Sequence, residues 1–148
     1  MRFPARFAPF VTILLLLPSA VGCSSPRPAD GAAVRVPVRL KDFRVDVGRA
    51  VVGQGRVRFE VVNRGPTTHE LNVVRTDLPE NELPLDADRL TVVANDARLV
   101  HLGEAEGLDI DDHRTLTLDL APGHYVLYCN MDGHYQSGIA TELTVVAR

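Results

Sequence analysis

The sequence lacks the features that mark several large classes of protein. It has no glycine-rich phosphate loop and no internal repeat, and its 16 lysines and arginines, against 19 aspartates and glutamates, form no basic stripe. A nucleic-acid-binding domain carries clustered positive charge, so we predict no nucleic-acid partner. The apolar run around residues 10–17 is too short to cross a bilayer as a helix. We therefore expect neither a nucleotide-binding fold nor a spanning helix.

The first residues have the pattern of a secretory signal. Arg2 and Arg6 form a basic start, an apolar run follows, and the segment ends in Ala20-Val21-Gly22-Cys23. Small residues before a cysteine resemble the bacterial lipoprotein signal, in which that cysteine receives the lipid. We predict a signal peptide over residues 1–22 and lipidation of Cys23, which anchors the chain to a membrane without spanning it. Ordinary cleavage that leaves Cys23 free is the alternative.

The composition after Cys23 separates a linker from a domain. Residues 23–33 are rich in Pro, Ser, Gly and Ala without apolar periodicity, which predicts a flexible tether. Residues 34–148 are long enough for one domain. We expect that domain outside the cytoplasm, in a periplasm or on the outer face of the cell membrane.

Alternating apolar and polar residues in that domain predict short strands. They cover residues 34–40, 43–47, 56–62, 71–74, 100–102, 114–120, 125–129 and 140–146. Seven or eight such strands separated by turns favour an all-β fold, a single antiparallel β-sandwich. Pro37 has no N–H for a strand ladder, so we expect the first strand at an edge or a bulge. Residues 76–113 are the least regular, with a helical turn or two expected within 86–100, where Leu90 and Val93 share one side.

The cysteine count draws attention to Cys129. The chain has only two cysteines, and if Cys23 carries lipid then Cys129 has no disulfide partner. A lone thiol in an oxidising compartment is either functional or buried and inert. The imidazole of His134, five residues further on, favours a functional thiol.

Cys129 and His134 lie on one short loop and cannot surround a metal ion by themselves, so a third ligand is needed. His69, which follows the turn at residues 63–66, is the candidate. Two imidazoles and a thiolate form the trigonal set of electron-transfer copper sites, although such a set can also hold zinc. His101, His113 and His124 have no soft partner nearby in sequence and are expected on the surface.

The pattern around these residues resembles the cupredoxins, the blue copper proteins. The resemblance covers nearly all of residues 34–148 and rests on Pro122-Gly123, Tyr128-Cys129, Gly133-His134-Tyr135, Gly138 and Leu143-Thr144-Val145, together with the turn before His69. It implies a Greek-key β-sandwich of the cupredoxin type that holds one copper ion, cycling between Cu+ and Cu2+. The implied ligands are His69, Cys129 and His134.

Two positions depart from the family pattern. Ile139 stands where the family usually has an axial methionine, and its hydrocarbon side chain cannot coordinate. This predicts a three-coordinate copper with a raised potential, with Met131 as a poorly placed alternative axial ligand. Glu70 stands where many members have a small amide that ties the two ligand segments together, so its carboxylate either makes that tie or points to solvent.

The resemblance implies one-electron transfer to a redox protein partner. The missing axial methionine leaves copper delivery or storage, with an extracytoplasmic oxidase as acceptor, as an alternative. A non-redox β-sandwich binding module is a second alternative. Copper oxidases built from this fold need further copper centres and domains, so a single domain predicts a carrier and not an enzyme, expected to be a monomer.

Overall fold

The structure is a computed structural model that describes residues 32–148. Over this range it contains nine strands and no helix. Consequently, no described helix is long and apolar enough to cross a membrane. The predicted signal over residues 1–22, the lipid on Cys23 and most of the tether over 23–33 lie outside the described residues.

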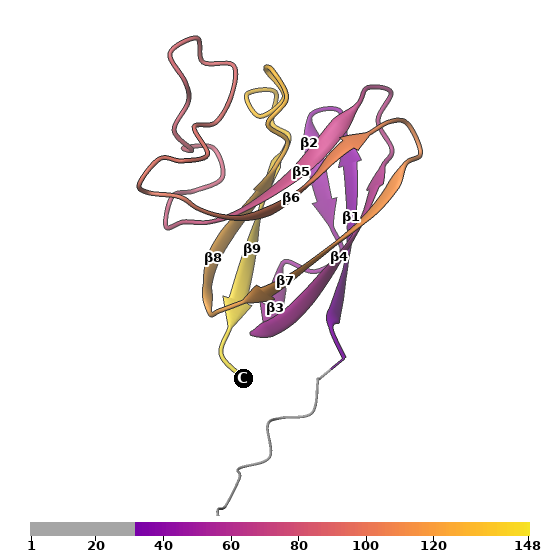
Figure 1. Cartoon of the computed structure of the whole chain (residues 1–148), viewed down its shortest axis with the longest axis vertical. Coiled ribbons are helices and arrows are strands. Elements are labelled where there is room, and N and C mark those ends of the chain that lie inside the picture. The colour runs from indigo at the N-terminus through magenta and orange to yellow at the C-terminus, as the bar shows by residue number, and fades with distance from the viewer. Residues whose placement is uncertain (1–31) are drawn as a thin grey trace, which may run out of the picture.

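The strands form two sheets packed face to face (Figure 1). In chain order they are β1 (Val34–Lys41), β2 (Arg44–Val47), β3 (Val51–Gly53), β4 (Gly55–Asn63), β5 (His69–Arg75), β6 (Val100–Leu108), β7 (His113–Leu120), β8 (Gly123–Tyr128) and β9 (Ala140–Val146). One sheet has the order β2-β1-β4-β7 and the other β3-β9-β8-β5-β6. The predicted all-β sandwich is confirmed.

The sandwich differs from the prediction in strand number and direction. β3 was not predicted, because three residues are too few for an alternating pattern to show. The sheets are mixed and not purely antiparallel, since β1 pairs in parallel with β4 and β3 in parallel with β9. Between β1 and β4 the chain passes through β2 and then through β3 of the second sheet, so β1 and β4 are not joined by a hairpin and lie parallel.

Alternation along β1 and β4 builds the core between the sheets. Every second side chain of these strands is buried, and the intervening ones face outward. The inward residues are Val36, Val38, Leu40, Val57, Phe59 and Val61. The same face meets Leu127, Leu143 and Val145 from the opposite sheet, so the apolar residues of the alternating pattern form the buried face of these strands.

Pro37 lies in β1, which is an interior strand with an unbroken register to β4, and not at the predicted edge or bulge. The proline is tolerated because the β1–β2 pairing begins only at Val38, opposite Val47. The carbonyl of Pro37 accepts a hydrogen bond from Gly48 N at 2.8 Å just beyond that pairing. Since the N and O of a strand residue point to the same side, the missing N–H faces a place where no strand partner exists.

The predicted helical turns within residues 86–100 are absent. Leu85 and Val92 instead form an isolated antiparallel bridge, and the Asp86 carboxylate accepts the N–H groups of Leu90 and Thr91. An aspartate that bonds backbone N–H groups in this way competes with helix formation. After this segment, β6 extends to Leu108, further than the predicted strand over residues 100–102. The prediction was too short because most residues of β6 are exposed and show little apolar–polar alternation.

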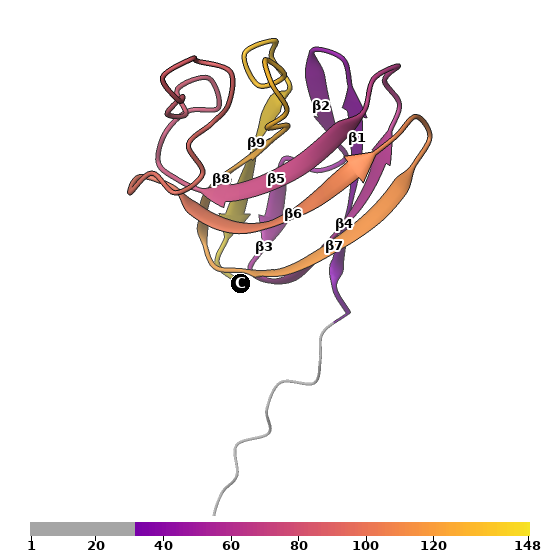
Figure 2. The same cartoon turned by 45° about the horizontal axis from the view of Figure 1, so that its top comes forward.

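The segment between β5 and β6 covers the outer face of the second sheet (Figure 2). A second hydrophobic cluster forms there from Val74, Leu83, Val92, Leu99, Val126, Tyr128 and Tyr135. Val74 and Val126 alternate with Val73 and Leu127, which face the main core. Both faces of the central strands β5 and β8 are therefore buried, and the outer cover lies against the loop that follows β8.

Candidate metal centre

The strand register brings the predicted ligands together. β5 and β8 are antiparallel, with Asn72 opposite Tyr128, so the first residue of β5, His69, lies near the residue that follows β8, Cys129. β8 also pairs with β9, and Cys129 N donates to the carbonyl of Ile139 at 3.0 Å. The loop over residues 129–139 is thereby closed at its base by the sheet.

Tight turns hold His134 inside this loop. Gly133 and Gly138 adopt φ values of 74° and 93°, which favour glycine. His134 N donates to the carbonyl of Met131 at 2.9 Å, so the chain turns back directly after Cys129. The loop glycines noted in the sequence therefore have a conformational role on both sides of His134.

His69, Cys129 and His134 form one cluster. One donor atom from each lies within 4.8 Å of the others, and no other such group of three occurs in the described chain. Cys129 Sγ is 3.3 Å from His134 Nδ1. The rings of His69 and His134 are 4.9 Å apart between centroids and inclined at 59°. The structure thus assembles the set predicted from sequence, whereas His101, His113 and His124 join no such group.

Cys129 is fully buried and forms no disulfide within residues 32–148. Burial raises the pKa of its thiol, while the backbone N–H groups of Glu70 and Met131 act in the opposite direction. Glu70 N lies 3.4 Å from the sulfur. A buried thiol with N–H groups directed at it is suited to ionise when a cation takes the place of its proton.

His69 has one ring nitrogen engaged and one free. Nε2 lies 3.1 Å from Asp42 Oδ1, while Nδ1 is buried without a hydrogen-bond partner in the described structure. Burial lowers the pKa of His69, although Asp42 opposes this shift. A neutral imidazole with an unpartnered buried nitrogen is the form that binds a metal ion. The site therefore fits a thiophilic ion, with His69, Cys129 and His134 as the residues that would hold it.

The turn before His69 is organised by Asn63, whose side chain is completely buried. Its amide donates to the carbonyls of Thr67 at 2.7 Å and Leu108 at 2.9 Å, and its oxygen accepts Gly65 N at 2.8 Å. All three bonds fix the short segment that leads into β5. This explains why an Asn-x-Gly sequence precedes His69.

Glu70 makes the tie that the family pattern assigns to an amide. Its Oε1 accepts Asn130 N at 3.2 Å and Asn72 Nδ2 at 2.9 Å. Solvent is the commoner environment for a glutamate, but here the carboxylate joins β5 to the loop over residues 129–139, the ligand loop. Glu70 consequently contributes to the site through both its backbone and its side chain.

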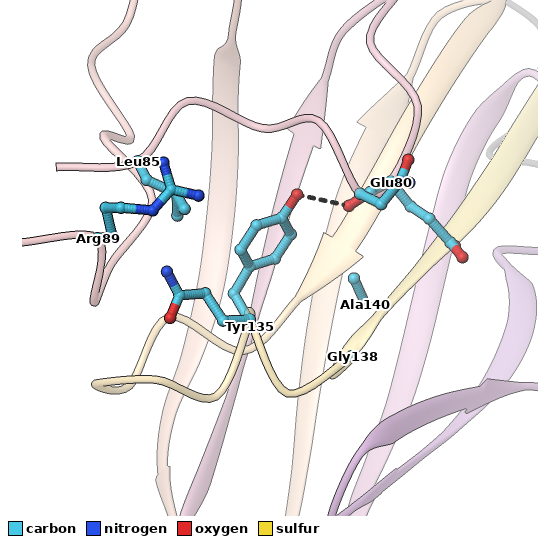
Figure 3. A pocket seen from close by; sticks show the side chains of 8 residues that line it. Glu80, Leu85, Arg89, Tyr135, Gly138 and Ala140 are labelled. Atoms are coloured by element: carbon cyan, nitrogen blue, oxygen red, sulfur yellow. Dashed lines mark hydrogen bonds between the residues drawn. The ribbon is translucent and has the colours of Figure 1, made fainter.

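The segment over residues 76–99 braces the ligand loop from outside. Val92 N donates to Asn130 Oδ1 at 2.6 Å, and Gly133 N donates to the carbonyl of Leu90 at 2.9 Å. The Tyr135 hydroxyl donates to the carbonyl of Glu80 at 2.7 Å, as Figure 3 shows beside an open pocket. This brace could not be predicted from the sequence, because its hydrogen-bonded partners lie 38 to 55 residues apart.

Tyr135→Phe is expected to lower the free energy of unfolding by about 1–3 kcal/mol. The hydroxyl also accepts Leu83 N at 2.9 Å, so its loss leaves a buried N–H and a carbonyl without a partner. The measurement is urea unfolding of the purified protein. Tyr128→Phe is the matched control, since the Tyr128 hydroxyl is buried without a partner and its removal should be neutral or stabilising. Equal losses in both variants would contradict the assigned role of Tyr135.

Ile139 and Met131 lie close to the cluster in sequence but supply no strong donor. Ile139 is 2% exposed and belongs to the main core, where its side chain offers only carbon atoms. Met131 is partly buried and packs against the same core. Asp42, in contrast, contacts His69 and was not predicted, because 27 residues separate the two and nothing in the local sequence marks the contact.

Two mixed sheets packed as a sandwich, with the cluster at one end, are the architecture of the cupredoxins, the blue copper proteins. Solved structures show the same fold at low sequence identity. An auracyanin from Roseiflexus castenholzii is 20% identical, with a TM-score of 0.59 over 78% of this chain and 99% of its own. Auracyanin A from Chloroflexus aurantiacus, a blue copper protein, is 16% identical, with a TM-score of 0.53 over 76% and 99% of the two chains.

Rusticyanin from Thiobacillus ferrooxidans is 13% identical, with a TM-score of 0.56 over 78% of this chain and 79% of its own. Neither a comparison with protein-family models nor one with curated protein sequences finds a match. The cupredoxin fold implied by the sequence is therefore confirmed.

Proposed function

We propose that this protein is a mononuclear copper protein that transfers single electrons outside the cytoplasm, with His69, Cys129 and His134 as its ligands. The observation that carries the proposal is His69 Nδ1, buried and without a partner beside the Cys129 thiol and the His134 imidazole. A buried polar atom without a partner is costly unless something binds it. The fold, shared with blue copper proteins, supports the same conclusion.

A copper ion held by these residues supplies one-electron chemistry between Cu+ and Cu2+. The protein contributes a fixed donor geometry, because β5, β8 and the braced loop hold each ligand in place. Burial of His69 and Cys129 keeps water from the sulfur and one imidazole, whereas His134 is only partly buried. His134 is therefore the ligand nearest to a redox protein partner.

The test is to load the purified protein with one equivalent of Cu2+ and record its optical spectrum. A thiolate-to-copper charge-transfer band in the visible is expected, together with reversible bleaching by a reductant. Zinc binding alone, or a copper-loaded sample that stays colourless under oxidant, would overturn the proposal. Metal analysis of the protein purified without added metal distinguishes a copper site from a zinc site.

Ile139→Met is expected to lower the reduction potential of the copper-loaded protein. A thioether near the copper favours the oxidised ion, whereas hydrocarbon at the axial position favours the reduced ion. Ile139→Leu is the matched control, because it changes side-chain shape without adding sulfur. Voltammetry on the three proteins measures the effect, and equal potentials for the methionine and leucine variants would show that residue 139 is not axial.

Copper delivery or storage is the second candidate function, favoured by the non-coordinating Ile139 side chain. A site biased toward Cu+ and open at His134 is suited to hand copper to an acceptor such as an extracytoplasmic oxidase. The exchange rate separates the two functions. A carrier retains copper for hours in the presence of a competing chelator, and a donor releases it within minutes.

The position at which β1 begins relates the predicted lipid anchor to the proposed metal site. β1 starts at the end of the sandwich opposite the loop that joins β8 and β9 (Figures 1 and 2). A lipid on Cys23 would hold the chain by the end that precedes β1. Because the tether would join the domain at the opposite end, the ligand loop would remain accessible to a redox protein partner.

A further inference from the structure

A carboxylate contacts the buried histidine of the proposed copper site. Asp42 lies in the turn between β1 and β2, and its Oδ1 is 3.1 Å from His69 Nε2. The same oxygen accepts the Thr67 hydroxyl at 3.1 Å. The His69 side chain is 0% exposed and that of Asp42 is 30% exposed, so the contact joins a buried ring to the edge of the solvent.

This contact determines which nitrogen of His69 carries the proton. An ionised carboxylate can only accept, so the proton resides on Nε2 and the lone pair on Nδ1. Nδ1 is the nitrogen that is buried without a partner. The two observations agree: Asp42 holds one nitrogen of the ring, and the other nitrogen, Nδ1, is left free to bind a metal ion.

The packing around the contact fixes its geometry. A Cβ on Gly65 would lie 2.8 Å from both Asp42 Oδ1 and His69 Nε2, so the turn over residues 63–67 closes over the hydrogen bond and leaves no room for a side chain. On the other side, a Cβ on Gly138 would lie 3.1 Å from the carbonyl of Phe43. The β1–β2 turn is therefore held between the segment before His69 and the ligand loop.

We infer that Asp42 is a positioning residue for the copper site. It fixes the tautomer and orientation of His69 and makes the Nδ1 atom of that ring a stronger ligand for the metal. The inference rests on the proposed copper function. A carboxylate on the far nitrogen raises the basicity of a ligating imidazole and favours the ion of higher charge. Asp42 thus acts against the bias toward Cu+ that Ile139 introduces, and the two residues together set the potential.

The test compares Asp42→Asn with Asp46→Asn in the full-length protein. Asp46 lies in the same hairpin and pairs with Lys41 and Arg44, so its replacement removes the same charge without touching His69. For Asp42→Asn we expect the ratio of Cu2+ to Cu+ affinity to fall about tenfold. That change equals a rise of about 59 mV in a one-electron potential. Asp46→Asn should change the ratio less than about twofold. Equal potentials in the two variants would overturn the inference.

A second measurement needs no metal. The 15N chemical shifts of the His69 ring in the metal-free protein should show the proton on Nε2 in the wild type and a mixture of tautomers in Asp42→Ala. A proton on Nδ1 in the wild type would overturn the inference. If the wild-type protein binds no copper, the proposed function fails, while the tautomer measurement still decides whether Asp42 positions His69.

Discussion

Replacing Cys129 with serine is expected to abolish the visible band of the copper-loaded protein and to weaken copper binding more than about 100-fold. The band requires a thiolate bound to the copper, and serine supplies only a hydroxyl, which stays protonated and is a poor ligand for Cu+. Even the loss of a group that supports a ligand costs about 10–100-fold in metal affinity, so loss of the ligand itself should cost more. Optical titration with copper measures both effects.

The control for this substitution is Met131→Leu, which removes the other sulfur of the ligand loop. Met131 packs partly buried against the core, so leucine should preserve both the band and the fold. A band that survives in Cys129→Ser would show that the thiolate is not the ligand. A copper affinity that falls as far in Met131→Leu as in Cys129→Ser would assign Met131 to the copper, contrary to its packing against the core.

Asn63→Ala is expected to lower the free energy of unfolding by about 3 kcal/mol. The side chain makes three hydrogen bonds, to the carbonyls of Thr67 and Leu108 and from Gly65 N, and each contributes about 1 kcal/mol. Their loss also releases the turn that sets His69 in place. We therefore expect copper affinity to fall as well, although Asn63 contacts no donor atom of the cluster.

Urea unfolding with and without copper checks this prediction. Asn81→Ala is the matched control, because Asn81 is exposed and its replacement should change stability by less than about 0.5 kcal/mol. If Asn63→Ala falls within the same range, the Asn63 hydrogen bonds do not organise the turn before His69.

The predicted strands show which parts of the fold are local in origin. β1, β4 and β9 are readable because each alternates buried and exposed residues over seven to nine positions. β3 is too short for this pattern, and β6, at a sheet edge with few buried residues, is only partly visible. The irregular segment over residues 76–99 is stabilised by contacts with the ligand loop, so its own sequence could not reveal its structure.

The sequence by itself identified the three residues proposed as donors, because few residue types bind a soft metal and their spacing places two of them on one short loop. It also determined the all-β class and the position of Ile139 beside that loop. The tertiary structure decided how the ligands are supported: Asp42 on His69, Glu70 on the ligand loop and Tyr135 on the outer brace. These contacts join residues that are 27 to 60 positions apart, and only the packing of two sheets brings such positions within hydrogen-bond distance.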